Sequence, residues 1–129
     1  MKNKVKVKVN ESKWTIVCNN LCGNILLSDQ VPDLEVWRER MSIDVALTTS
    51  VFNSALSTAS ILVRIVRKEG SPVEFSIPPG NTLSATVDDA QSIIVFKEGI
   101  GGIEGKFSLE VCFPVFHDVK CNHKNKKES

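Results

Sequence analysis

The segment Gly105-Lys-Phe-Ser-Leu-Glu-Val-Cys-Phe113 decides the fold, because apolar and polar side chains alternate along it. Its phenylalanines, leucine and valine point to one face of an extended chain, and its serine, glutamate and cysteine point to the other. Such a period of two is typical of a β-strand with one face in the core and one in solvent. Cys112 belongs to the polar face, so we expect its thiol to face solvent or another chain.

The same alternation continues upstream and predicts a chain of short strands. Four further strands are expected, separated by turns that carry glycine, proline or paired aspartates: residues 61–68, 73–77, 83–87 and 92–97. The glycine-rich stretch at 99–105 joins two strand patterns rather than a strand to a helix. We therefore interpret it as a hairpin loop and not as a phosphate-binding loop.

The pattern is weaker in the N-terminal half. Residues 13–18 and 24–28 each predict a strand. Residues 34–47 fit an amphipathic helix and an alternating strand about equally well, and we favour a strand because the rest of the chain is β. Residues 48–60, rich in Thr, Ser, Ala and Asn, are expected to form a loop.

About eight short strands predict an all-β fold. Among antiparallel sandwiches we favour an eight-stranded jelly roll over an immunoglobulin-like order, because the Cys…Trp…Cys spacing is loose and the sequence contains no tyrosine. We expect the jelly-roll domain at residues 14–119. A flexible basic N-terminal arm at 1–13 would precede it, and a basic disordered tail at 120–129 would follow.

The net charge of +1 hides an uneven distribution. Residues 1–13 carry +4, residues 14–119 carry −6 and residues 120–129 carry +3. The arm presents its lysines on one face, at Lys2, Lys4, Lys6 and Lys8. It could add to a sheet edge or contact the acidic body of a neighbouring copy. The alternative is that both basic ends only keep the protein soluble.

The cysteines leave several chemistries open. They are Cys18, Cys22, Cys112 and Cys121. Exposed thiols at strand ends and in a tail suit disulfides between chains, and free thiols or bonds within one chain are equally open. A zinc site that adds His117 and His123 is only weakly indicated, because a chain of this length does not need a metal to fold. No apolar segment follows the basic N-terminus, so we expect no secretory signal, and an intracellular chain would normally keep its thiols reduced.

Other function classes find little support in the sequence. No Gly-x-Ser-x-Gly, Walker loop or His-Glu-x-x-His motif occurs, so we expect neither an enzyme nor a cofactor. No apolar run approaches the roughly 18 residues of a membrane span. We therefore expect no membrane partner. The body is acidic and the basic arm has no aromatic residues among its lysines, so we also expect no nucleic-acid partner.

Four segments of the chain carry a resemblance to a known family: Trp14-Thr-Ile-Val-Cys-Asn-Asn-Leu-Cys22, Pro79-Gly-Asn-Thr-Leu-Ser-Ala-Thr-Val87, Gln91-Ser-Ile-Ile-Val-Phe96 and Gly102-Ile-Glu-Gly-Lys-Phe-Ser-Leu-Glu-Val111. They are similar to segments of the endospore appendage subunits of Bacillus-type spores. With looser similarity between them, the resemblance covers about residues 14–113.

The resemblance implies an eight-stranded jelly roll that polymerises on the spore surface. Such subunits join edge strands of neighbours, and cysteines of a flexible N-terminal arm form inter-subunit disulfides. The acceptor cysteines lie near the first strand and on the last, regions that Cys22 (or Cys18) and Cys112 match. Synthesis in a mother cell that later lyses would reconcile disulfides with the missing signal.

The arm departs from this family pattern, because residues 1–13 contain no cysteine. Cys121 in the tail could substitute for the missing donor. The expected function is a structural, self-assembling subunit of a spore-surface appendage, ring or helical fibre, in a minor, terminal or anchoring role beside other appendage subunits. The alternative is a non-catalytic jelly-roll module that binds carbohydrate or another surface ligand.

Overall fold

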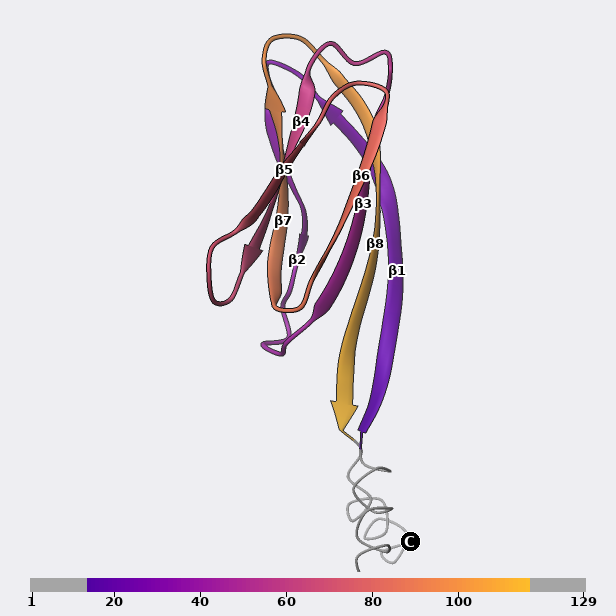
Figure 1. Cartoon of the computed structure of the whole chain (residues 1–129), viewed down its shortest axis with the longest axis vertical. Coiled ribbons are helices and arrows are strands. Elements are labelled where there is room, and N and C mark those ends of the chain that lie inside the picture. The colour runs from indigo at the N-terminus through magenta and orange to yellow at the C-terminus, as the bar shows by residue number, and fades with distance from the viewer. Residues whose placement is uncertain (1–13, 117–129) are drawn as a thin grey trace, which may run out of the picture. The chain divides into compact units, whose positions relative to one another are not determined.

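The computed structural model describes residues 14–116, and this part of the chain consists of eight β-strands (Figure 1). The strands are β1 (Trp14–Leu27), β2 (Asp33–Arg38), β3 (Ala46–Asn53), β4 (Ser60–Arg67), β5 (Val73–Ile77), β6 (Asn81–Val87), β7 (Ala90–Glu98) and β8 (Ile103–Phe116). Within the described range, no helix is long and apolar enough to cross a membrane.

The strands form two four-stranded sheets, which appear as two layers in Figure 1. The order is β1-β8-β3-β6 in the first sheet and β2-β7-β4-β5 in the second. Only β4 and β5 are neighbours both in sequence and in a sheet, and every other connection crosses between the sheets. This connectivity is that of a jelly roll, so the predicted fold class is confirmed.

Two compact units share these strands. The larger, residues 18–112, holds the core. The smaller includes the ends of β1 and β8, where the rings of Trp14 and Phe116 meet edge to face with their centroids 5.1 Å apart. Such a ring pair contributes about 0.5–1.5 kcal/mol. The expected domain limits, 14–119 with an arm and a tail, remain predictions.

The core lies between the two sheets and consists of aliphatic side chains that alternate with more exposed ones. In β4, Ile61, Val63 and Ile65 have no exposed surface, and the residues between them are half-exposed. Further fully buried aliphatic side chains include Ile25, Leu47, Val51, Ile77, Ile93 and Val95. Each side chain of this size stabilises the fold by about 1.5–3 kcal/mol when it leaves water.

The expected loop at residues 48–60 is wrong for its first part, because β3 (Ala46–Asn53) runs through the first sheet between β8 and β6, and it is confirmed for residues 54–59, which join β3 to β4. Its polar residues fit a strand because they pair across it. The hydroxyl groups of Thr48 and Thr86 lie 3.1 Å apart, and the Ser84 hydroxyl donates to that of Ser50 over 3.0 Å. A composition rich in Thr and Ser therefore marks the solvated face of a strand here.

Residues 34–47 form neither a helix nor one continuous strand. β2 ends at Arg38 and β3 begins at Ala46, so the preference for strand is confirmed only at the two ends. The Glu39 carboxylate holds the bend between them by accepting from the N–H groups of Met41 and Ile43. Burial alone would raise the pKa of Glu39, but these bonds and one from Lys68 hold it below its ordinary value.

Two further expectations need correction. Residues 13–18 and 24–28, expected as separate strands, belong to the single strand β1 from Trp14 onward. The glycine-rich stretch at 99–105 contains no hairpin, because β7 and β8 lie in different sheets. Its backbone is held to the opposite loop, where the Thr58 hydroxyl accepts from the Gly102 N–H over 3.0 Å. Alternation shows which face a strand buries but not which strand it pairs with.

Candidate functional site

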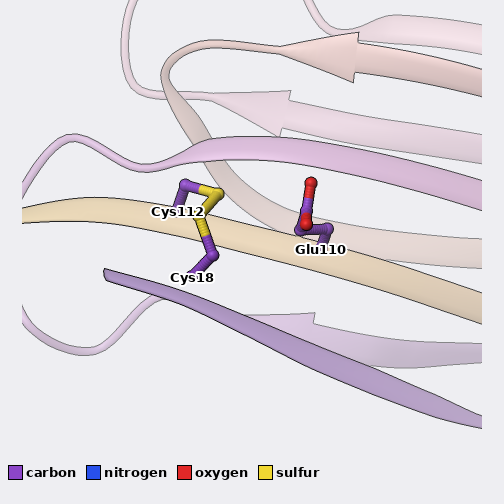
Figure 2. Close-up of side chains that lie close together, drawn as sticks. All are labelled: Cys18, Glu110 and Cys112. Atoms are coloured by element: carbon purple, nitrogen blue, oxygen red, sulfur yellow. A yellow bond between two sulfur atoms is a disulfide. The ribbon is translucent and has the colours of Figure 1, made fainter. Parts of the chain in front are cut away.

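The outer face of the first sheet carries a disulfide between β1, an edge strand, and its neighbour β8 (Figure 2). Cys18 and Cys112 are 94 positions apart in sequence, and their Cα atoms lie 4.1 Å apart. Cys18 is exposed and Cys112 is half-buried. Of the two bonding schemes that the sequence left open, the structure shows the one within a single chain for this pair.

Strand parity explains why both thiols meet on this face. Leu109 and Val111 of β8 are buried, so Cys112 points away from the core, as the alternation predicted. In β1, Ile25 and Leu27 are buried, whereas all even-numbered positions are exposed. Because residues 14–27 form one strand, Cys18 shares the outer face with the other even-numbered residues. The sequence predicts two strands here, and from two strands the face of Cys18 could not be deduced.

Cys22 is the one free cysteine among residues 14–116, and it is exposed. It borders a groove of about 500 Å³ on the outer face of the first sheet, lined also by Gly23, Asn24, Ser50, Phe52, Lys106, Phe107 and Ser108. Its neighbour Gly23 packs closely, because a Cβ atom at that position would lie 2.7 Å from the Phe107 ring and would force the ring to shift. The thiol is therefore accessible to another molecule on a well-packed strand.

The disulfide also lies beside a carboxylate. Ligand atoms of Cys18, Glu110 and Cys112 all lie within 4.8 Å of one another. Zinc binds the thiolate form of cysteine, and neither sulfur is a thiolate in the disulfide. The donor set therefore does not fit a metal while this bond exists. Of the further residues in the weakly indicated zinc alternative, His117, Cys121 and His123 lie outside the described residues. Lys2, Lys4, Lys6 and Lys8 also lie outside them.

The second sheet has protected edges. β5 has only five residues, and Pro72 and Pro78 flank it. β2 has six residues and an irregular register between Glu35 and Trp37. Arg38 adds a surface ion pair to this edge, with its Nη2 atom 2.6 Å from a Glu35 oxygen. Short length, irregular register, charge and proline are the features that keep an edge strand from pairing with other chains.

The first sheet has open edges instead. Neither β1 (Trp14–Leu27) nor β6 (Asn81–Val87) contains a charged residue or a proline. The register between β6 and β3 is regular over all seven residues of β6. Leu83, on β6, keeps 42% of its surface exposed. An uncharged, regular edge of this kind is a template for another strand.

The turn that follows β6 is fixed by an ion pair. Arg67 Nε donates to Asp89 Oδ1 over 2.7 Å, and the Lys68 N–H donates to the Asp89 carbonyl over 3.0 Å. The hydrogen bond from Arg67 holds the pKa of Asp89 below its ordinary value of 3.8. The pair thus anchors the open edge strand to the end of β4 in the opposite sheet.

A family model described as endospore appendages matches residues 5–115. Among solved structures, the chain is similar to one described as "Bacillus endospore appendages form a novel family of disulfide-linked pili". It is 12% identical, the alignment covers 81% of this chain and 92% of that one, and the TM-score is 0.69. At this identity the likeness shows the fold.

A family 11 carbohydrate-binding module from a cellulosomal cellulase of Clostridium thermocellum aligns over 81% of this chain and 88% of its own. Its identity of 9% and TM-score of 0.26 are too low to support any shared property. No curated protein sequence matches. The family match implies a structural protein of a spore-surface appendage rather than an enzyme, which confirms the resemblance and the expectation of a non-catalytic chain. Because the match spans most of its length, the chain belongs to the endospore appendage family.

Proposed function

We propose that this chain is a self-assembling subunit that polymerises into a ring or helical fibre through its edge strands. The observation that carries the proposal is the difference between the two sheets. β1 and β6 are uncharged, and β6 pairs with β3 in a regular register, whereas β2 and β5 are short and protected. A neighbouring strand would satisfy the backbone groups at the outer side of an edge such as β6 and would extend the sheet from copy to copy.

Disulfides between subunits would then lock the paired edges. Cys22 is exposed on β1, so it can meet a cysteine of another copy. Cys18 and Cys112 can join other chains once their mutual bond opens. Cys121 is a further candidate, and it lies outside the described residues.

The basic arm would hold a neighbour without a covalent bond. Lys2, Lys4, Lys6 and Lys8 carry charge opposite to the −6 of residues 14–119, and no cysteine lies among residues 1–13. Charge and strand pairing would therefore replace the family's covalent donor. The missing arm cysteine supports a minor, terminal or anchoring role beside other appendage subunits. Synthesis in the mother cell is a separate part of the proposal.

Leu83→Lys tests the edge proposal. The new ammonium group can reach water past the free edge of β6, but a paired strand would bury it without a partner. We expect the assembled fraction to fall at least about tenfold, a loss of about 1.4 kcal/mol per contact. Light scattering and electron microscopy of the concentrated protein under oxidising conditions would measure it.

Val31→Lys is the matched control, because Val31 is 44% exposed and lies in the turn between β1 and β2. If Leu83→Lys assembles like Val31→Lys, β6 is not a pairing edge. A wild-type protein that remains monomeric at high concentration would refute self-assembly. A discrete monomer that binds glycans on an array would favour the carbohydrate-binding alternative.

Deleting residues 1–12 tests the arm. Exposed charge contacts are screened by salt, so the full chain should assemble less at 1 M than at 0.1 M sodium chloride. The deletion should assemble less at low salt and lose most of this salt dependence. If the full chain and the deletion assemble equally at low salt, the arm lysines contribute to solubility and not to assembly.

A further inference from the structure

We propose that subunits become covalently linked by thiol–disulfide exchange, in which Cys22 of one copy attacks the Cys18–Cys112 disulfide of the next. The inference rests on the proposed self-assembly. The observation behind the inference is that one folded chain contains both reactants. Within residues 14–116 it has one disulfide and one exposed free thiol, on the same outer face.

Cys22 cannot attack the disulfide of its own chain. Cys18 and Cys22 lie four positions apart on the single strand β1. A strand rises about 3.3 Å per residue, so their Cα atoms are roughly 13 Å apart along it. Two cysteines form a disulfide only when their Cα atoms lie within about 7 Å of each other. The folded chain therefore keeps its thiol and its disulfide apart, and the reaction needs a second copy.

Of the two bonded residues, Cys18 is the more exposed, so we take its sulfur as the point of attack. This residue is exposed on an edge strand, whereas Cys112 is half-buried on β8, between β1 and β3. An attacking thiolate approaches in line with the bond that it breaks, so attack at Cys18 Sγ expels Cys112. Figure 2 shows the bond from Cys18 to Cys112 joining the two strands.

The exchange needs no oxidant. The Cys22 thiolate of the first copy forms a bond to Cys18 Sγ of the second, and the Cys18–Cys112 bond breaks. Its electron pair leaves with Cys112 Sγ, which takes up the proton that Cys22 had released. One disulfide is consumed and one is made. Direct coupling of two Cys22 thiols would instead remove two electrons and would join chains only in pairs.

Glu110 restrains the reaction. Its carboxylate lies within 4.8 Å of both sulfur atoms, on the same face of β8 (Figure 2). A negative charge there opposes both the incoming and the departing thiolate. Loosely colliding copies would then exchange slowly, and copies held together by paired edges would exchange faster.

Two complementary variants test the exchange. The donor, Cys18→Ser with Cys112→Ser and Cys121→Ser, keeps only Cys22. The acceptor, Cys22→Ser with Cys121→Ser, keeps only the disulfide. Without oxygen or oxidant, the mixture should give a covalent dimer on a non-reducing gel, and neither variant alone should give one. After trapping with N-ethylmaleimide, mass spectrometry should find the label on Cys112 of the acceptor. No dimer, or a label on Cys18, would overturn the proposal.

The Cys121→Ser variant covers the case of a donor that does not fold. Under the same oxygen-free conditions it should form a ladder while its thiol titre stays at one per chain. A falling titre would mean oxidation and would refute exchange. Glu110→Gln in the Cys121→Ser background should exchange about fourfold faster. An unchanged rate would show that Glu110 does not slow the exchange.

Electron microscopy of the acceptor separates the two proposals. Assemblies of the acceptor, together with no covalent link in either experiment, would refute exchange and leave self-assembly standing. Absence of assemblies in the acceptor and in the wild-type protein would refute both.

Discussion

Replacing Asn53 with alanine should weaken the contact between the two sheets. Asn53 ends β3 in the first sheet and has no exposed surface. Its Nδ2 group donates to the Ala59 carbonyl over 3.0 Å and to the Ile77 carbonyl over 2.9 Å. Ile77 belongs to β5 in the second sheet, so one amide group connects both layers at this end.

The cost follows from the two carbonyl groups that lose a donor. Each buried group left without a hydrogen bond costs about 1–3 kcal/mol. The Asn53 Oδ1 atom has no partner among the described residues, so its removal relieves part of that cost. We therefore expect a loss of about 2–3 kcal/mol in the free energy of unfolding. For a domain of this size the melting temperature should fall by about 8–12 °C.

Urea unfolding followed by tryptophan fluorescence measures the change, and Trp37 on β2 reports on the second sheet. Asn81→Ala is the matched control, because Asn81 is exposed and its Nδ2 donates only to nearby carbonyls in its own turn. We expect the control to lose less than about 1 kcal/mol. If the two variants differ by less than about 1 kcal/mol, Asn53 does not join the sheets as described.

Three further changes probe the packing and charges of the site. Gly23→Ala should lower the free energy of unfolding by about 1–3 kcal/mol, because the new Cβ atom would lie 2.7 Å from the Phe107 ring. The control is Gly102→Ala, whose Cβ atom would have its closest neighbour at 3.7 Å, and urea unfolding should show a smaller loss for it. Asp89→Asn should destabilise the chain more at pH 7 than at pH 3. The pKa of Asp89 is lower folded than unfolded, so the stabilisation exists above its ordinary value of 3.8 and disappears as the pH falls through the lower folded value. Equal losses at both pH values would refute this. Reducing the β1–β8 disulfide, which closes a loop of 94 residues, should cost roughly 4–5 kcal/mol in a paired unfolding experiment with and without reductant.

The sequence by itself determined which side chains enter the core. Alternation between residues 61 and 113 predicted the strands of the second half, and they are present as β4 to β8. It also placed Cys112 on the outer face, where its sulfur lies. These features are local, because a strand turns each successive side chain to the opposite face whatever its partner is.

Tertiary structure decided the partners. Residues 48–53 form a strand between β8 and β6, where hydroxyl groups of β6 pair with those of Thr48 and Ser50. Nothing in the seven residues of β6 indicates that this strand lies at the edge of a sheet. Its edge position follows only from the order of the strands in the sheet. The bond from Cys18 to Cys112 depends on the pairing of the first strand with the last. Backbone N–H and C=O groups are the same at nearly every residue, so alternation specifies a buried face but leaves the neighbouring strand to the packing of the whole chain.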